Sequence, residues 1–249
     1  GHWADYARSL FFVPGSFDEA DAYENLKTRL EWIDEQFGIS GSRVFYLSIP
    51  PQLVPVCAKH LKAAGLVTDP GETNCFSRVI VEKPIGRDLA SAKQVMDAVD
   101  QAVDERQTYR IDHYLGKETV QNMLVLRFAN SIFEPLWHHK YIDHVQITVS
   151  EGEGLTQYDP QTDKVTGSRI GYFEGVGALR DMVQNHILQV LCLVAMEPPW
   201  SLDPDVVRDA KTGVLRCLRR MTPADVDKSV VRAQYIAGDA HGQMVPGYR

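Results

Sequence analysis

Apolar and polar positions alternate with two different periods over the first part of the chain. Three segments have helical spacing, with an apolar side chain at every third or fourth position: 20–38, 51–65 and 87–103. Three short runs are rich in β-branched and aromatic residues, as is typical of buried strands: 43–50, 77–84 and 107–114. After the first helix the order is β-α-β-α-β, which predicts parallel strands in a doubly wound α/β sheet.

Turn and capping residues mark the ends of these helices. Gly38 and Gly65 follow the last apolar positions of the first two, where a glycine commonly ends a helix. Asp88 is the expected N-cap of the third helix. The apolar stripe expected to face the core from that helix consists of Leu89, Ala92, Met96, Val99 and Val103.

The regular alternation stops near Asp112, and we place a domain boundary there. Beyond it, segment 117–130 has helical spacing, and segment 142–154 has the weaker alternation of a strand. Segment 175–199 predicts one long helix that ends at a Pro-Pro pair. The two expected domains are 1–112 and 113–249.

Composition and charge narrow the class of protein. Hydrophobic residues make up 44% of the 249 residues and charged residues 24%, as in an ordinary globular protein. The net charge of -7 argues against nucleic acid or an anionic membrane as the main partner. No apolar run reaches the roughly 18 residues needed to cross a bilayer. The four cysteines form no C-x-x-C pair, so we expect reduced thiols in a cytosol-type compartment.

Polar residues gather where the three predicted strands end. Ligands of doubly wound sheets bind at the carboxyl ends of parallel strands. We therefore expect Lys83, Asp112 and His113, which lie at the ends of two of these strands, to share one cleft. Lys83 favours this interpretation because the end of a buried strand is a costly place for a charge.

The predicted long helix carries a polar stripe. At about 100° per residue, four polar side chains share one arc of the helix: Asp181, Gln184, Asn185 and Gln189. His186 flanks that arc. The stripe could line a pocket or face water, and a lone histidine such as His186 is more often a core or surface residue than a functional one. If Asp112 reaches His186, its carboxylate fixes the tautomer of the imidazole, and the ring can accept a proton from a substrate.

His113, Tyr114 and Lys117 lie around the flexible Gly116 and offer imidazole, hydroxyl and ammonium donors. A phosphate monoester needs several donors and at least one fixed cation. The same residues could also form a solvated turn before a helix, and the residue types alone leave both possibilities open.

Two other patterns carry little weight. GVGALR contains G-x-G but has an arginine where a dinucleotide-binding fingerprint needs a third small residue. The histidines of HHKYIDH do not have the spacing of a common zinc site, so we expect no metal.

Several motifs together resemble the glucose-6-phosphate dehydrogenase family. RIDHYLGKE at 110–118 resembles the signature of that family. The other matching motifs occur in the family's order: FYLSIPP, VEKPIGRDL, VLRFAN, GYFEGVGALRDMVQNHILQVLCLVAMEPP and VRDAK. The resemblance covers essentially the whole chain. It implies an internal fragment of a longer enzyme, because the family's N-terminal glycine-rich turn and its C-terminal part are absent from these 249 residues.

The resemblance implies NADP-dependent oxidation of glucose 6-phosphate at C1 to 6-phosphoglucono-1,5-lactone, the first step of the oxidative pentose phosphate pathway. It implies a partial Rossmann-like domain for NADP over 1–112. Over 113–249 it implies part of an α+β domain with a large, mainly antiparallel sheet, which binds substrate and forms a homodimer or homotetramer. It further implies a cytoplasmic location, with neither nucleic acid nor membrane as partner.

Two alternatives stay open beside this function. One is a non-catalytic, sugar-phosphate-binding fragment of such an enzyme, which the missing glycine-rich turn favours. The other is a hexose-6-phosphate dehydrogenase that accepts a broader range of sugars.

The resemblance also implies roles for individual residues. His186 matches the general base that takes the proton of the C1 hydroxyl, and Asp112 matches the carboxylate that pairs with this base. The phosphate-binding set matches His113, Tyr114 and Lys117.

Further matches surround the sugar and the cofactor. Glu151 and Asp181 match acidic residues that bond to sugar hydroxyls, and Arg169 matches a basic residue beside the sugar and phosphate. Lys83 matches a residue near both sugar and nicotinamide. The positions implied on the cofactor side are Pro50, Glu82 and Lys83.

Overall fold

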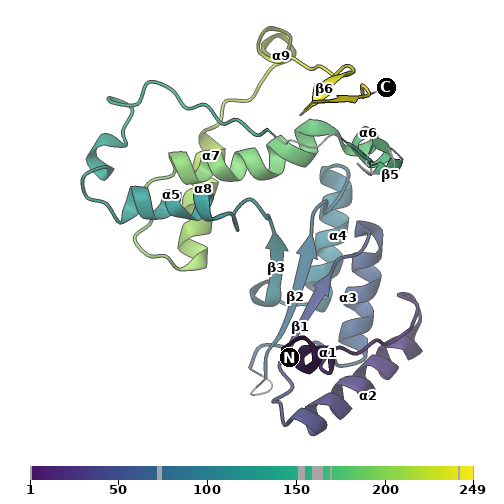
Figure 1. Cartoon of the computed structure of the whole chain (residues 1–249). Coiled ribbons are helices and arrows are strands. Elements are labelled where there is room, and N and C mark those ends of the chain that lie inside the picture. The colour runs from purple at the N-terminus through teal and green to yellow at the C-terminus, as the bar shows by residue number, and fades with distance from the viewer. Residues whose placement is uncertain are drawn as a thin grey trace. The chain divides into compact units, whose positions relative to one another are not determined.

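The computed structural model describes residues 2–71, 75–150, 155–158, 165–168, 170–240 and 242–248. The chain divides into two compact units, Gly1–Asp112 (unit 1) and His113–Arg249 (unit 2), and Figure 1 labels their elements. Each unit is described by itself.

Unit 1 contains a parallel sheet of three strands in the order β1-β2-β3. The strands are Arg43–Leu47 (β1), Ser77–Glu82 (β2) and Thr108–Ile111 (β3). The helices are His2–Ala7 (α1), Ala20–Phe37 (α2), Pro51–Leu53 (η1), Val54–Ala63 (α3), Leu89–Ala102 (α4) and Glu105–Gln107 (η2). Parallel neighbours require a crossover, and α3 and α4 supply the two crossovers between successive strands.

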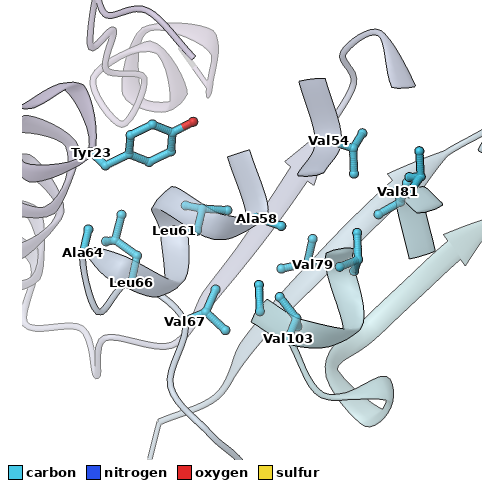
Figure 2. Close-up of a cluster of buried hydrophobic side chains, with 13 residues drawn as sticks. Tyr23, Val54, Ala58, Leu61, Ala64, Leu66, Val67, Val79, Val81 and Val103 are labelled. Carbon is cyan, nitrogen blue, oxygen red and sulfur yellow. The ribbon is translucent and has the colours of Figure 1, made fainter. Parts of the chain in front are cut away.

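One continuous apolar core holds unit 1 together, and Figure 2 shows its side chains. Val79 and Val81 of β2 are at most 1% exposed, and Leu61 of α3 and Val99 of α4 pack into the same cluster. These contacts arise because alternate residues of a strand point to one face of the sheet, where the apolar stripes of α3 and α4 cover them.

The prediction of a buried first strand is wrong for the other face of the sheet. Val44 and Tyr46 are both 54% exposed, and Tyr109 of β3 is 45% exposed. The run 43–47 is apolar on both faces, which predicts burial on both. In the described part of unit 1, however, the core helices α3 and α4 pack on one face only.

Helix α4 begins as predicted, and its predicted stripe is buried at Val99 and Val103 but not at Leu89. The Asp88 carboxylate accepts a 2.8 Å hydrogen bond from the Ser91 backbone N–H, which confirms the N-cap. Leu89, predicted in the core, is 72% exposed, whereas Val95 and Ala102 are buried. The apolar arc of this helix is broad, so the residues at its centre depend on how the helix packs against its neighbours.

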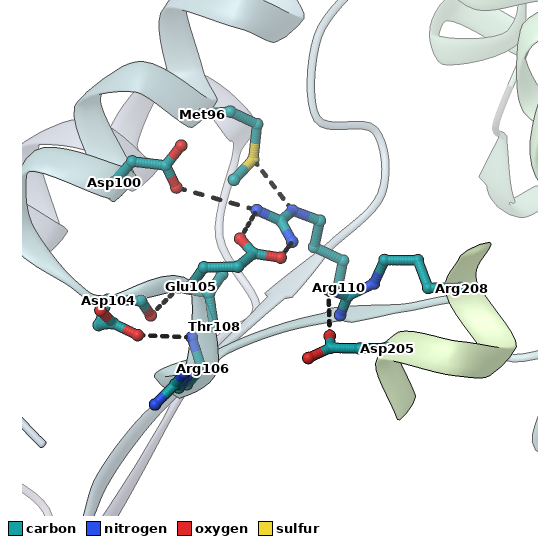
Figure 3. A network of polar contacts seen from close by, with 9 residues as sticks. All are labelled: Met96, Asp100, Asp104, Glu105, Arg106, Thr108, Arg110, Asp205 and Arg208. Atoms are coloured by element: carbon teal, nitrogen blue, oxygen red, sulfur yellow. Dashed lines mark hydrogen bonds and ion pairs between the residues drawn. The ribbon is translucent and has the colours of Figure 1, made fainter. Parts of the chain in front are cut away.

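Arg110 anchors the strand that leads into the RIDHYLGKE motif. Its guanidinium donates two hydrogen bonds to the Glu105 carboxylate, at 2.9 and 2.7 Å, and lies 3.9 Å from Asp100 (Figure 3). The hydrogen bonds to Glu105 raise the pKa of Arg110. This bidentate geometry is the favourable one for an arginine-carboxylate pair, and it ties β3 to η2.

Unit 2 is mainly helical. Its helices are Glu118–Phe128 (α5), Glu134–Leu136 (η3), Ile170–Ala178 (α6), Leu179–Ile187 (η4), Leu188–Ala195 (α7), Pro204–Cys217 (α8) and Pro223–Ser229 (α9). Its antiparallel pairs are Thr156–Tyr158 (β4) with Val165–Ser168 (β5), and Gly238–Ala240 (β6) with Gln243–Val245 (β7). Helices α5 and α8 both pack against α7.

The prediction of a strand over 142–154 is wrong for the residues that the structure describes. Residues 142–150 form neither a helix nor a strand, and residues 151–154 lie outside the described residues. Partial burial alternates weakly there, since Ile147 and Val149 are more buried than their neighbours. A strand needs a hydrogen-bonded neighbour, and 142–150 pairs with no strand among the described residues.

The fold class is confirmed: a parallel three-stranded sheet with crossover helices is followed by a helical unit with small antiparallel sheets. All four cysteines lie in the described part of the chain, and none of them forms a disulfide. A search of the described residues finds no helix with the length and apolar content to traverse a bilayer.

Candidate functional site

The carboxyl ends of β1, β2 and β3 lie along one edge of the sheet, because the strands are parallel neighbours. Leu47 pairs with Val81, and Glu82 pairs with Ile111, so the segments that leave the strands begin side by side. The predicted site residues that leave from this edge of unit 1 are Pro50, Glu82, Lys83 and Asp112.

Glu82 is held by the neighbouring strand. Its carboxylate accepts a hydrogen bond from the hydroxyl of Tyr46, which belongs to β1. That hydrogen bond raises the pKa of Tyr46, because a phenolate would face the carboxylate across the strands. Glu82 therefore offers a carboxylate acceptor in a restrained position at the strand end.

The loop after β2 packs closely on the start of α4. Lys83 is partly buried, and its peptide bond to Pro84 is cis. The backbone N–H of Arg87 donates a 2.9 Å hydrogen bond to the Ser91 hydroxyl. A Cβ at Gly86 would overlap the backbone of Ala92, so only glycine allows this approach. These contacts fix the loop that carries Lys83 where it meets α4.

The prediction of a single long helix over 175–199 is wrong, because three helical segments, α6, η4 and α7, take its place. Helix α6 breaks at Gly177, whose φ of 72° and ψ of 162° are not helical. The following segment, η4, is a π-helix, and α7 ends at Ala195. In a π-helix the hydrogen bonds run from i to i+5, so the arc drawn at 100° per residue does not apply to residues 179–187. π-Helical turns are frequent at functional sites.

His186 is the buried residue of η4 and the centre of a cluster of three rings. Its side chain is fully buried, at 0% exposure. The Tyr114 ring stacks on the imidazole, with centroids 4.1 Å apart and planes inclined by 18°. The His113 ring meets the imidazole edge-on at 4.4 Å and 65°. Unit 2 thus brings three of the predicted site residues into direct contact, although they come from segments far apart in the sequence.

Lys117 joins this cluster through Tyr114. Its Nζ lies 3.6 Å from the centroid of the Tyr114 ring, within the range of a cation–π contact. The Lys117 backbone N–H donates a 3.1 Å hydrogen bond to the Tyr114 carbonyl, and Gly116 N–H donates to the His113 carbonyl at 3.2 Å. The turn before α5 therefore holds the imidazole, hydroxyl and ammonium groups of the predicted phosphate set close together.

Asp181 lies on the same π-helix as His186, and a tyrosine from α6 reaches it. The Tyr172 hydroxyl donates a 3.2 Å hydrogen bond to Asp181 Oδ1. Burial, and after it the charge and hydrogen bond of Asp181, raise the pKa of Tyr172 to about 12. Tyr172 is therefore a hydroxyl donor throughout the physiological pH range, and the hydrogen bond spans the break at Gly177.

The predicted site residues fall into two described groups. Unit 1 carries one at the strand ends, Pro50, Glu82, Lys83 and Asp112, and unit 2 carries the other, His113, Tyr114, Lys117, Asp181 and His186. Glu151 and Arg169 lie outside the described residues. The second group combines an imidazole with cationic and hydroxyl donors for an anion, and it includes a carboxylate for hydroxyl groups.

Sequence reasoning missed the role of Arg127. This arginine is only 4% exposed, and it donates hydrogen bonds to the carbonyls of Leu193 and, at 2.8 Å, Met196. Trp137 donates a 2.7 Å hydrogen bond to the Val194 carbonyl. Together they satisfy the carbonyls at the end of α7, which continues from the helix of His186. The available signal was the single charged residue between apolar ones in VLRFAN.

Two family descriptions match the chain, and together they account for nearly all of it. Residues 1–122 match "Glucose-6-phosphate dehydrogenase, NAD binding domain". Residues 124–249 match "Glucose-6-phosphate dehydrogenase, C-terminal domain".

Individual relatives carry the same name. Glucose-6-phosphate 1-dehydrogenase 2 of Mycobacterium tuberculosis is 45% identical over 99% of this chain and 45% of its own length. Glucose-6-phosphate 1-dehydrogenase of Chlamydia pneumoniae is 46% identical over 99% of this chain and 46% of its own. The chain therefore spans about half the length of these curated relatives.

Solved structures agree with the sequence relatives. A glucose-6-phosphate dehydrogenase in complex with glucose-6-phosphate superposes with a TM-score of 0.70 and 32% identity, covering 94% of this chain and 44% of that chain. Glucose-6-phosphate 1-dehydrogenase from Mycobacterium avium gives a TM-score of 0.73 and 33% identity, over 89% of this chain and 43% of its own.

Proposed function

Because this chain belongs to the glucose-6-phosphate dehydrogenase family, we propose that it oxidises glucose 6-phosphate at C1 to 6-phosphoglucono-1,5-lactone with NADP⁺ as the oxidant. The observation that carries the proposal is the ring cluster of unit 2, in which a fully buried imidazole contacts two residues of the RIDHYLGKE motif. The cluster combines a base with donors for an anion, as a phosphorylated sugar requires.

His186 is the proposed general base. The reaction removes two hydrogens from C1 and its hydroxyl: a proton goes to the imidazole and a hydride leaves C1 as the C1–O bond becomes a carbonyl. A side-chain base of this kind contributes roughly 10²–10⁴-fold to the rate. Asp112 is proposed as its carboxylate partner on the strength of the family resemblance, and it would fix the imidazole tautomer.

The phosphate of the substrate is proposed to bind His113, Tyr114 and Lys117. The turn that links these residues holds their side chains close together, and Lys117 supplies the cation. Binding a group remote from C1 orients the reacting carbon, and loss of one of several phosphate contacts should appear mainly as a higher KM. Asp181, held by Tyr172, is proposed to accept hydrogen bonds from sugar hydroxyls.

The cofactor is proposed to bind unit 1 at the carboxyl ends of its strands. The donor set there fits a nicotinamide, since Glu82 offers a restrained acceptor and Lys83 a partly buried donor. Pro50 leaves β1 at the same edge. When bound, NADP⁺ would accept the hydride from C1. Residues 1–112 would then form part of the NADP-binding domain, and residues 113–249 part of the substrate and dimerisation domain.

The family resemblance extends the proposal to the assembly and its location. The protein is proposed to form a homodimer or homotetramer through its second domain and to act in the cytoplasm.

The decisive experiment measures NADPH formation by its absorbance. The purified chain should reduce NADP⁺ when glucose 6-phosphate is added, and should do so far more slowly with glucose. His186→Asn keeps the approximate size of the side chain but removes the base, so we expect kcat to fall at least roughly 10²-fold with a smaller change in KM.

His144→Asn is the matched control, because the side chain of His144 is 68% exposed and hydrogen-bonded to Asp143, its exposed sequence neighbour. It should retain wild-type kcat. A wild-type chain that neither binds glucose 6-phosphate in calorimetry nor forms NADPH would contradict the proposed function. A His186→Asn variant within threefold of wild-type kcat would contradict only the role of the base.

A further inference from the structure

The plane of the His186 imidazole must be fixed by its surroundings. The terminal torsion of a histidine side chain has broad energy wells, so the side chain alone does not orient the ring. A general base, however, works only when its nitrogen points at the proton it accepts. The groups that restrict rotation of this buried ring are therefore part of the catalytic apparatus.

Of the two rings that contact the imidazole, that of Tyr114 is the better placed to do this. Its ring is nearly parallel to the imidazole, at 18° and 4.1 Å, and both side chains are buried, at 7% and 0% exposure. Rotation of the imidazole about its last torsion would drive its edge into the Tyr114 ring. His113 touches the imidazole as well, but His113 is exposed to solvent and provides a less rigid contact.

The backbone around Tyr114 makes its ring a firm support. Its carbonyl accepts the Lys117 N–H, and Lys117 is the N-cap residue from which α5 begins. The Lys117 ammonium lies over the ring itself, 3.6 Å from its centroid. Tyr114 is thus restrained through its backbone and through its ring, independently of its hydroxyl.

We propose that Tyr114 has two separable roles: its hydroxyl binds the substrate phosphate, and its ring is a positioning element that sets the plane of the His186 imidazole. The second role rests on the proposed function and goes beyond it. One residue would then couple occupation of the phosphate site to the orientation of the base, because movement of its side chain affects both.

Two substitutions separate the roles. Tyr114→Phe removes the hydroxyl and keeps the ring, so KM for glucose 6-phosphate should rise while kcat stays within about threefold of wild type, or about 0.65 kcal/mol. Tyr114→Leu also removes the ring, so kcat should fall at least about tenfold below that of the phenylalanine variant, which corresponds to about 1.4 kcal/mol. Tyr141→Leu, at a tyrosine that is 68% exposed, is the control and should change neither constant.

A second measurement reports on the ring contact without any turnover. In NMR spectra of this chain, the ring current of Tyr114 should move the chemical shifts of the carbon-bound protons of His186 from their usual values. These signals are assigned by their loss in His186→Asn. Tyr114→Phe should preserve that displacement and Tyr114→Leu should abolish it. Circular dichroism and the unfolding midpoint would show whether each variant folds.

The outcomes distinguish this inference from the proposed function. Equal kcat losses in the two Tyr114 variants, or His186 signals that do not respond to Tyr114→Leu, would overturn the positioning role while glucose 6-phosphate oxidation stands. A wild-type chain without binding or turnover would overturn the proposed function and the catalytic consequence of the contact together. Turnover that is preserved in Tyr114→Phe and lost in Tyr114→Leu, together with the NMR change, would establish the positioning role of the Tyr114 ring.

Discussion

The two units differ in what they bury. The core of unit 1 is a continuous apolar cluster, and its buried polar side chains, such as Gln107, are neutral and bonded to backbone carbonyls. Unit 2 has fewer buried apolar residues among those described, and it also buries Arg127 and His186. Burial of a cationic or titratable group costs free energy that apolar burial does not.

The contrast indicates a division between support and chemistry. Unit 1 obtains its stability from apolar packing and keeps its predicted site residues at strand ends, outside the core. Unit 2 places a predicted catalytic residue inside its own packing, where neighbouring rings restrain it. Changes to the core of unit 1 should therefore act mainly on stability, whereas changes in unit 2 should act on the site as well.

The largest expected effect comes from emptying the core of unit 1. Leu61→Ala removes a 2%-exposed side chain from α3 and should lower the free energy of unfolding by about 2–5 kcal/mol. Urea unfolding measures the total, and hydrogen exchange with mass spectrometry shows in which unit protection is lost. Leu89→Ala is the control, since Leu89 is 72% exposed and should change stability by no more than about 0.5 kcal/mol. Similar losses in the two variants would remove the basis for a single apolar core.

A smaller effect is expected at the helix break in unit 2. Gly177 has φ 72° and ψ 162°, a region that is essentially restricted to glycine, so Gly177→Ala should cost about 1–3 kcal/mol. Hydrogen exchange should show the loss in α6 and η4. Gly175→Ala lies in the same helix, has nothing within 4 Å of the added Cβ, and should be neutral or mildly stabilising. If Gly177→Ala proved as stable as Gly175→Ala, residue 177 would not need the glycine-only backbone conformation that breaks the helix.

The smallest effect concerns two tyrosines, one in each unit. Burial raises the pKa of Tyr23 in unit 1, and burial followed by Asp181 raises the pKa of Tyr172 to about 12. Asp181→Asn should therefore lower the pKa of Tyr172 partway toward 10 and leave that of Tyr23 unchanged, as measured by ¹³C NMR titration of the tyrosine rings. A Tyr172 titration that is insensitive to Asp181→Asn would show that burial alone shifts it.

The raised pKa of Tyr172 also makes the stability of the folded chain fall as the pH rises above about 10. Because the folded-state pKa of Tyr172 lies above its unfolded value, the unfolded chain loses the proton first as the pH rises. The contribution of Tyr172 to stability is complete below about pH 10 and is lost between about pH 10 and 12. Tyr172→Phe should remove this part of the alkaline unfolding profile.

Period and capping residues were enough to predict most of unit 1. The three strands, their parallel order and the Asp88 cap follow from local patterns that the fold reinforces. The exposed face of β1 and the exposed Leu89 could not be predicted, because an apolar residue does not specify which partner covers it. In unit 2 the π-helix was missed because a wheel at 100° per residue assumes α-helical hydrogen bonding throughout.

The candidate site was predictable in part. Strand-end placement predicted that Lys83, Asp112 and His113 lie in one cleft, without any knowledge of the substrate. The strand register places Lys83 and Asp112 at one edge of the sheet, and the shared cleft stays a prediction. The contact of His186 with Tyr114 joins residues far apart in the chain, so spacing could not reveal it, and the residue roles came from the family resemblance. Tyr172 and Arg127 lie within quoted motifs, but those motifs assigned them no role; their hydrogen bonds in the folded chain single them out.

The break at Gly177 also separates two helical phases. In an uninterrupted α-helix, each residue inserted or deleted rotates every later side chain by about 100°. Here the helix that carries His186 starts anew after the break, and its orientation is set by its continuation into α7. Length changes within α6, upstream of Gly177, therefore need not turn the imidazole away from its neighbours, because the phase of the helix after the break does not depend on the residues before it.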